Sequence, residues 1–405
     1  MELLEWPNVR LDGAGWGAHG GRREPLPGLL LRGQAPPGKT LLQGGAGPRR
    51  EWSDPLAALS WMEASLRGEL RGGRWVGWLS YDLGRLFESL PSEATDDLSL
   101  PLFQFTYHPP VQSEHPVRAW RTIRDARPCP PRWNFTRASY TAVVRRALDY
   151  IAAGDVFQVN LSQRCSVALP RQPGSVYERL LASTPAAYGA LLDYHDHAIV
   201  SNSPELFLRV RPHPDGSGRR QVLTRPIKGT RPNAPGMLQQ LRDSAKDEAE
   251  LNMIVDLERN DLGRVCEVGS VKVTERRAIE EHPTVYHGVA TVAGALRPDV
   301  GFVDLLRATF PGGSVTGAPK IRAMQIIDEL EPVRRGPYCG AIGYVAGGDD
   351  FAFNVAIRTI VVTPDGLAHV SVGGGIVADS DPAAEYEETL VKARATLAAL
   401  GVTGL

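Results

Sequence analysis

Apolar residues at helical spacing give the clearest structural signal in this chain. Thr136 is of the residue type that caps helix N-termini, Gly154 is suited to end a helix, and an apolar stripe lies between them. The stripe consists of Val143, Val144, Ala147, Leu148 and Ile151. Because these positions recur every three or four residues, they predict an amphipathic helix from about residue 136 to 154.

The period changes to two directly after this helix. Across residues 156–163 apolar and polar side chains alternate, as they do along a strand with two different faces. The side chains expected to face a core are Phe157, Val159 and Leu161. The opposite face carries the polar, uncharged residues Gln158, Asn160 and Ser162.

Further along, groups of strands alternate with helices. Strands are expected at 198–202, 205–210, 340–346, 351–362 and 368–376, and helices at 242–260, 302–308, 319–330 and 382–400. Grouped strands with helices between the groups predict an α+β fold. Residues 1 to about 50 show no clear period, and the proline-rich stretch 108–134 is expected to be a connector around an edge strand.

Composition narrows the class of protein. A chain of 405 residues with 42% hydrophobic and 22% charged residues is typical of a soluble globular protein with a substantial core. The net charge of −1 gives no electrostatic reason to expect nucleic acid or an anionic membrane as partner. No apolar run reaches the length of a membrane span, and residues 1–6 lack the features of a signal peptide. Cysteines without CxxC spacing disfavour zinc and a disulfide framework and favour a cytoplasmic location; these are Cys129, Cys165, Cys266 and Cys339.

The first chemical candidate is Lys228. Pro226 and Gly229 flank it, so it is expected where a strand ends and turns, with its side chain aimed into a cleft. An amine becomes nucleophilic when burial or neighbouring cations lower its pKa, and Arg225 and Arg231 are close in sequence. The alternative is a solvated surface lysine.

Two pairs of acidic residues form the second candidate. Asp247 and Glu250 are spaced i, i+3 in one expected helix, and Glu385 and Glu388 repeat this spacing in the last helix, one turn before Lys392. Carboxylates from two helices could build a Mg²⁺ site together with waters and an anionic substrate. The alternative is that each pair solvates an exposed helix face.

Glycine-rich segments form the third candidate. The loop at 311–320 resembles a phosphate-binding loop, but Ala318 and Pro319 displace its lysine, which disfavours a nucleotide P-loop. A glycine turn that opens a helix still presents free backbone N–H groups to a carboxylate or phosphate. The cluster Gly373-Gly374-Gly375 implies close approach of the backbone to another group. Two tight turns without a ligand are the alternative reading.

Taken in order, these segments resemble the chorismate-utilising enzymes. The resemblance spans about residues 75–400 and is carried by the following segments: 81–85, the strand around Gln158, 203–205, 224–231, 253–261, 311–320, 340–344, the strand around Arg358, and 373 through the last helix. Salicylate and isochorismate synthases carry a water-activating lysine where this chain has Gln158. Anthranilate synthase component I typically carries alanine where this chain has Lys228. The chain therefore resembles most closely the aminodeoxychorismate synthase component I group.

This resemblance implies a fold and a division of the chain. The implied fold is one large α+β domain, with two stacked, mainly antiparallel sheets and helices on the outside. Residues 1–134 would form an N-terminal region like that of anthranilate synthase component I, and residues 135–405 the chorismate-binding catalytic region, integrated with it. Residues 211–220 look like an inserted surface hairpin. The N-terminus lacks the Leu-Leu-Glu-Ser motif of tryptophan binding, so tryptophan feedback is not expected.

The resemblance also implies an allylic substitution on chorismate. Lys228 would add to ring carbon 2, Glu205 would protonate the leaving 4-hydroxyl, and ammonia would then expel Lys228. The implied substrate-binding residues are Gln158, Thr230, His287, Thr316, Tyr344, Arg358, Gly374, Gly375 and Lys392. Mg²⁺ would be held by Glu250 and Glu388 with Asp247 and Glu385 in support. For His287 alone, a hydrogen-bonded core histidine is the alternative.

A partner is implied by what the chain lacks. None of the four cysteines lies in the Gly-x-Cys-x-Gly context of a glutaminase nucleophile, so a separate glutamine amidotransferase subunit is expected to supply ammonia. Anthranilate synthase component I and a catalytically silent chorismate-binding paralogue are the competing hypotheses.

Overall fold

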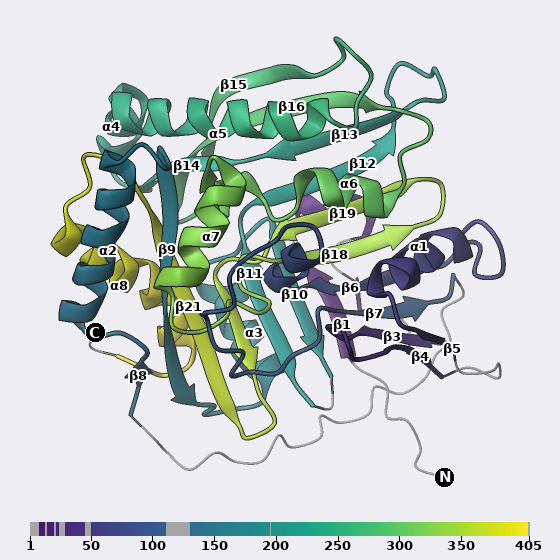
Figure 1. Cartoon of the computed structure of the whole chain (residues 1–405), viewed down its shortest axis with the longest axis horizontal. Helices are drawn as coiled ribbons and strands as arrows, with labels where there is room; N and C mark the ends of the chain where they lie inside the picture. Colours follow the sequence, from purple (N-terminus) through teal and green to yellow (C-terminus); the bar gives the residue numbers. More distant parts are fainter. Residues whose placement is uncertain are drawn as a thin grey trace.

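The structure, a computed structural model, describes residues 8–12, 14–19, 22–23, 29–44, 50–110, 130–194 and 196–403. Two antiparallel sheets lie at its centre (Figure 1). The nine-stranded sheet has the order β17 (Gly317–Ala318), β9 (Gln158–Ala168), β21 (Leu367–Ile376), β20 (Thr359–Val362), β11 (Ala198–Ser203), β10 (Tyr188–Asp193), β1 (Asn8–Asp12) and β2 (Arg22–Arg23), with β8 (Arg132–Trp133) beside β9.

The second sheet has twelve strands. Its order is β14 (Ile227–Pro232), β16 (Val285–Leu296), β13 (Arg220–Arg225), β12 (Leu206–Pro212), β19 (Asp350–Val355), β18 (Ala341–Ala346), β6 (Arg74–Leu79), β7 (Phe103–His108), β3 (Leu29–Gly33), β4 (Thr40–Gln43) and β5 (Arg50–Trp52), with β15 (Lys272–Glu281) beside β16. Strands from before and after residue 134 therefore share both sheets.

Helices cover the outer faces of the two sheets. The helices are α1 (Pro55–Ser65), α2 (Arg137–Ala152), α3 (Pro173–Ser183), α4 (Met237–Asp243), α5 (Ala245–Gly263), α6 (Phe302–Thr309), α7 (Lys320–Leu330) and α8 (Pro382–Ala399). Apolar residues of α3 and α8 pack on the nine-stranded sheet, and those of α1, α5 and α6 pack on the other. Between the sheets, Leu11 and Leu192 share a buried cluster with Trp78 and Ile342. This arrangement confirms the expected α+β fold with two stacked sheets.

The helices with strong end signals form where the sequence predicts them. The Thr136 hydroxyl accepts a hydrogen bond from the Ser139 amide at 3.1 Å at the start of α2, and Asp381 caps α8. The helix expected at 242–260 forms as α5, and the separate short helix α4 precedes it and ends at Asp243, where Ser244 caps α5. Among the described residues, no helix is long and apolar enough to cross a membrane.

Two strand predictions were wrong. The strand expected at 351–362 is divided into β19 and β20, which belong to different sheets, and Arg358 at the break has a positive φ of 50°. Phe157 does not face a core: its side chain is 73% exposed, whereas Val159 and Leu161 are buried. The reason is that β9 begins only at Gln158, so Phe157 precedes the part of the strand that the core covers.

A second pair of consecutive strands, β11 and β12, also crosses from one sheet to the other, next to the divided strand. β11 lies in the nine-stranded sheet and β12 in the other, and the crossing occurs at residues 204–205; the second crossing occurs at residues 356–358. The Val355 amide donates to the Glu205 carbonyl at 3.0 Å, and the Asn202 amide donates to the Arg358 carbonyl at 3.1 Å. We call these two hydrogen-bonded segments the crossing pair. They place Glu205 and Arg358 at the junction of the sheets.

The remaining expectations concern surface segments. Residues 211–220 form the end of the β12–β13 hairpin and its largely exposed turn, as expected for a surface insertion. The connector expected at 108–134 lies mostly outside the described residues, as does Cys129.

Candidate active site

Lys228 lies at an irregularity in β14 and not at the end of a strand. The register of β14 against β16 shifts between Ile227 and Thr230, and Gly229 within this bulge has a φ of +78°. Gly288 on β16 leaves room for the bulge, since a Cβ there would lie 2.6 Å from the Lys228 carbonyl oxygen. The sequence signal at Gly229 was therefore correct about irregular backbone but indicated the wrong kind of irregularity.

The environment of Lys228 favours a neutral amine. Burial lowers the pKa of Lys228 and outweighs the opposing effect of Glu250, while Lys392 lowers it further. Within the described part of the chain, its amine makes no hydrogen bond or ion pair of its own. An amine held without a direct partner is suited to act on an incoming ligand.

Glu205, in the crossing pair, is a buried acid beside Lys228. Its side chain is 4% exposed, and burial raises its pKa to about 7. The Ser314 hydroxyl, the charge of Lys228 and the Ile227 amide all act in the opposite direction without cancelling the effect of burial. Near neutral pH, Glu205 can therefore hold and release a proton.

Arg358 lies near Glu205, and His287 lies near Arg358. Burial lowers the pKa of Arg358, and Glu205 partly offsets this effect. Burial and the nearby Arg358 charge lower the pKa of His287 to about 3, so its imidazole is neutral. His287 Nδ1 is hydrogen bonded to Thr230 Oγ1 at 2.9 Å. Like Lys228, the Arg358 guanidinium has no ion-pair partner among the described residues, so its charge favours an anionic ligand.

The polar face of β9 meets the glycine-rich loop. Gln158 is fully buried and donates from Nε2 to Asn160 Oδ1 at 3.3 Å, and Asn160 donates from Nδ2 to the Ser314 carbonyl at 2.7 Å. These contacts fix the Gln158 amide and leave its Oε1 as a buried acceptor to which no described residue donates. Gly375 permits this arrangement, because a Cβ there would lie 2.8 Å from Gln158 Nε2. Thr316 is buried in the same loop, and its hydroxyl donates to the Gly312 carbonyl at 3.0 Å.

Three of the four predicted metal carboxylates surround the lysines of the site. A Cβ on Gly374 would lie 3.1 Å from Glu385 Oε2 and 3.7 Å from Glu388 Oε1, so these two carboxylates meet over the second glycine cluster. Lys392 pairs with Glu388 at 2.6 Å and donates to the Gly373 carbonyl at 3.0 Å. Glu250, on α5, influences the pKa of Lys228, as does Glu388 on α8.

These carboxylates fit Mg²⁺ only as part of a larger set of ligands. Among the described residues, no three acidic, histidine or cysteine side chains are arranged as a ready-made metal site. Mg²⁺ commonly takes one or two carboxylates and completes its shell with water and an anionic substrate. Burial pushes the pKa of Glu388 up, but Lys392, Lys246 and Lys228 outweigh it and lower that pKa, which keeps Glu388 anionic. Carboxylates from α5 and α8 are thus suited to hold the ion once substrate is present.

Two residues of the predicted set have other partners. Asp247 is ion-paired with Arg231 at 2.8 Å. Tyr344 accepts from Arg209 at 3.5 Å, donates to Asp350 at 3.1 Å and packs with Trp16 in the core between the sheets. The substrate-binding role expected of Tyr344 stays a prediction.

Comparison with known proteins decides the family. Residues 32–398 match the model of the family described as chorismate binding enzyme. The chain belongs to this family. It is 42% identical over 348 residues to aminodeoxychorismate synthase component 1 of Salmonella typhimurium, covering 79% of this chain and 75% of that protein. It is 41% identical over 365 residues to anthranilate synthase component 1 of Thermus thermophilus, covering 81% and 77%.

Solved structures agree with this membership. Anthranilate synthase component I of Streptococcus pneumoniae superposes with a TM-score of 0.77 at 29% identity, covering 98% of this chain and 93% of that one. The menaquinone-specific isochorismate synthase of Escherichia coli has the same fold, with a TM-score of 0.67 at 18% identity. The protein is therefore a chorismate-utilising enzyme of the aminodeoxychorismate and anthranilate synthase group, as the sequence resemblance indicated.

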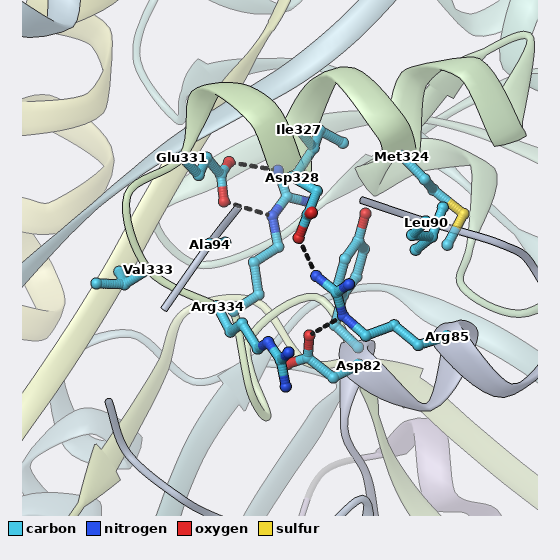
Figure 2. A pocket seen from close by; sticks show the side chains of 12 residues that line it. Asp82, Arg85, Leu90, Ala94, Met324, Ile327, Asp328, Glu331, Val333 and Arg334 are labelled. Atoms are coloured by element: carbon cyan, nitrogen blue, oxygen red, sulfur yellow. Dashed lines mark hydrogen bonds and ion pairs between the residues drawn. The ribbon is translucent and has the colours of Figure 1, made fainter. Parts of the chain in front are cut away.

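Two polar networks next to the site of this chorismate-binding enzyme escaped sequence reasoning. Arg335 binds Glu331 at 2.7 and 3.0 Å and donates to the carbonyls of Val315 and Asn160, each at 2.8 Å, so it holds the glycine-rich loop against β9. Both residues line a small pocket, and Figure 2 shows Glu331 at one side of it with the Arg85–Asp328 ion pair nearby. The sequence around Arg335 carries no motif for this network, because Val315 and Asn160 come close to Arg335 only in the folded chain.

The second network contains Glu258, which is 2% exposed on the buried face of α5. Burial, together with the nearby Asp261 charge, raises the pKa of Glu258 to about 8. Asp261 pairs with Lys320 at the start of α7, and Glu205 lies close enough to influence Glu258. The i, i+3 spacing of Glu258 and Asp261 was the only available signal, and it is identical to that of a solvated helix face.

Proposed function

We propose that this protein aminates chorismate at ring carbon 4, as an aminodeoxychorismate synthase component 1. The observation that carries the proposal is the pairing of Lys228 with Glu205. One is an amine without a direct partner whose pKa is lowered, and the other is a carboxyl group whose pKa is raised to about 7. An allylic substitution through a covalent intermediate requires a nucleophile whose neutral form is favoured and a proton donor that is still partly protonated near neutral pH.

The proposed reaction proceeds in two displacements. The Lys228 nitrogen forms a bond to ring carbon 2, both conjugated ring double bonds shift by one position, and the bond from carbon 4 to its hydroxyl breaks. Glu205 gives its proton to the departing oxygen, which leaves as water. Ammonia then forms a bond to carbon 4, both double bonds shift back, and the electron pair of the carbon–nitrogen bond returns to Lys228. The proton lost by the new ammonium group passes to Glu205, so the enzyme returns to its starting state.

The remaining residues bind the substrate, a dianion. Arg358 is suited to one carboxylate by its planar guanidinium, and neutral His287 with Thr230 adds polar contacts beside it. Glu250 and Glu388, with Glu385 in support, would hold Mg²⁺, which would neutralise the other carboxylate. Gln158 offers a fixed amide where a water-activating enzyme needs a base, and this supports ammonia as the nucleophile.

Ammonia is proposed to come from a glutamine amidotransferase subunit. Burial raises the pKa of the thiols of Cys266 and Cys339 to about 12, which disfavours either as a glutaminase nucleophile. The relatives from Salmonella typhimurium and Thermus thermophilus are both named component 1, a name that implies a second component. The nearly equal identity to both relatives also keeps anthranilate synthase as the second candidate function.

Product analysis tests the proposal. The purified protein is incubated with chorismate, Mg²⁺ and ammonium chloride at mildly alkaline pH, and products are identified by mass spectrometry, with Lys228→Ala alongside. We expect aminodeoxychorismate, which a lyase converts to 4-aminobenzoate, and loss of activity in the variant. Anthranilate as the main wild-type product would establish the second candidate, and binding of chorismate without any product would indicate a silent paralogue.

A further inference from the structure

An ion pair fastens the strand of Lys228 to helix α5. Arg231, three residues after Lys228 on β14, donates from Nη2 to Asp247 Oδ2 at 2.8 Å, and the two side chains are 26% and 15% exposed. Arg231 also donates from Nε to Gln240 Oε1 on α4 at 3.0 Å and from Nη1 to the Thr230 carbonyl at 3.0 Å. All three guanidinium nitrogens are therefore engaged, which fixes the side chain and the strand end.

The contact between Asp247 and the bulge is also direct. A Cβ on Gly229 would lie 2.9 Å from Asp247 Cγ and 2.7 Å from Leu241 Cδ1, so the backbone next to Lys228 packs against these side chains. Gly229 has a positive φ, and only glycine fits both this conformation and this space. The backbone of Asp247 is fixed as well, because its amide donates to the Ser244 hydroxyl at 3.2 Å in the first turn of α5. The helix end and the bulge thus form one packed unit.

This unit sets the spacing between the amine and a proposed metal ligand. Glu250 lies one turn after Asp247 on α5 and acts electrostatically on Lys228. If α5 moves relative to β14, the distance between the Lys228 amine and Glu250 changes with it. The Asp247 charge, in contrast, is already neutralised by Arg231 at hydrogen-bonding distance, which reduces its attraction for a metal ion.

We propose that Asp247 is a positioning residue that holds the Lys228 bulge through Arg231, and that it does not support the metal ion. The proposal rests on the proposed function, in which Lys228 is the nucleophile. It predicts that Asp247 and Arg231 act as one unit, so that removing either has the effect of removing both.

The test compares Asp247→Asn, Arg231→Gln and the double variant. We expect kcat to fall about tenfold in each single variant, because misplacing a nucleophile by a fraction of an ångström costs this much or more. The double variant should be no slower than the slower single variant, since residues that act through one contact are not additive. The Kd for Mg²⁺, measured by isothermal titration calorimetry, should change by less than about twofold in all three variants.

A matched control exists in the same turn of α5. Glu248 follows Asp247, is 57% exposed and pairs with Arg277 at 3.3 Å. Glu248→Gln removes an ion pair of the same type that does not contact β14's bulge residue Gly229, and should leave kcat and the Mg²⁺ Kd unchanged. Thermal unfolding of every variant checks that the fold is retained.

Hydrogen–deuterium exchange makes the test independent of catalysis. Amides of residues 227–231 should exchange faster in Asp247→Asn and Arg231→Gln but not in Glu248→Gln. If the wild type does not aminate chorismate, the proposed function fails, while this exchange measurement still decides whether the pair holds the bulge. Unchanged exchange, wild-type kcat in Arg231→Gln, or a Mg²⁺ Kd raised in Asp247→Asn alone would each overturn the proposal.

Discussion

Burial has opposite effects on the two groups proposed to carry the chemistry. It raises the pKa of Glu205 because the carboxylate loses hydration, and it lowers the pKa of Lys228 because the ammonium ion does. At neutral pH both shifts favour uncharged forms, namely a carboxylic acid that can donate and an amine that can attack. The same burial thus favours the acidic form of Glu205 and the nucleophilic form of Lys228.

This arrangement predicts a specific pH profile. With the concentration of free ammonia held constant, kcat/KM for chorismate should fall about tenfold per pH unit above pH 7, because Glu205 must be protonated and its pKa is about 7. Glu205→Gln should lose about 100-fold to 10,000-fold in rate and no longer show this alkaline decline. Steady-state kinetics between pH 6 and 9 check both, and a flat wild-type profile would contradict the role of Glu205.

Glu258 should affect stability in a pH-dependent way. Because burial raises its pKa from 4.5 to about 8, the folded protein binds more protons than the unfolded chain between these values, so stability falls as pH rises through that window. Glu258→Gln has no proton to lose and should raise Tm by about 2–4 °C at pH 8.5. At pH 4.5 the difference should vanish. Differential scanning calorimetry at both values decides, and an equal effect at both would rule out this linkage.

At the residue scale, motifs in the sequence indicated which residues belong to the site but not which side chains those residues contact. Lys228, Glu205 and Arg358 were found because their segments match a known family, and the structure places the three side chains near one another. Tyr344 came from the same resemblance, yet its hydroxyl is engaged with Asp350 in the intersheet core. A side chain's partners depend on register and packing, which a motif does not contain.

At the scale of elements, helices α5 and α8 bring opposite charges together. Lys246 on α5 lies 3.9 Å from Glu250. Burial raises the pKa of Glu385 on α8 and Lys246 opposes this shift, whereas the pKa of Glu388 is lowered overall by Lys392, Lys246 and Lys228. Although burial alone would raise the pKa of Glu385 and Glu388, these lysine charges partly neutralise the carboxylates proposed to hold Mg²⁺. Lysine and metal ion therefore compete for the same oxygen atoms.

Removing this lysine should strengthen metal binding. Lys246→Met is expected to lower the Kd for Mg²⁺ about twofold to fivefold at low ionic strength, because exposed pairs of this kind contribute up to about 1 kcal/mol. The gain should shrink at high salt, where such charges are screened. Isothermal titration calorimetry measures it, with Lys272→Met on exposed β15 as the control. Equal affinities for wild type and Lys246→Met at low salt would show that the charge is immaterial.

Elements were predictable where local signals suffice. The capped, amphipathic helices α2 and α8 and the alternating strand β9 were found, because their hydrophobic period and end residues are local properties. The division between β19 and β20 was missed, because Arg358 and Thr359 within this largely apolar run do not by themselves show that its two halves join different sheets. Strand pairing over long sequence separations, such as β6 with β18, left no local trace either.

At the scale of the whole molecule, the site belongs to both sheets. Lys228 is on the twelve-stranded sheet, Gln158 and Gly375 are on the other, and the crossing pair supplies Glu205 and Arg358 between them. The site can therefore form only after the two sheets have docked.

Refolding should show this order. In a chain of this size, intermediates with native-like secondary structure are common. After dilution from denaturant, far-UV circular dichroism should recover before chorismate binding, and fluorescence of the intersheet Trp78 should recover together with binding. Stopped-flow and manual-mixing measurements check this sequence. Binding that returns as fast as secondary structure would contradict it.

The crossing pair has a consequence for ligands as well. A ligand bound by residues from both sheets acts as a non-covalent cross-link between the two sheets. Its binding free energy therefore adds to the free energy that holds the sheets together. While it is bound, the substrate therefore stabilises the packing of the two sheets against each other. A cavity introduced at Ile342, in the apolar layer between the sheets, weakens the packing of the sheets. It thereby lowers the affinity for chorismate without any change in a residue that contacts the substrate.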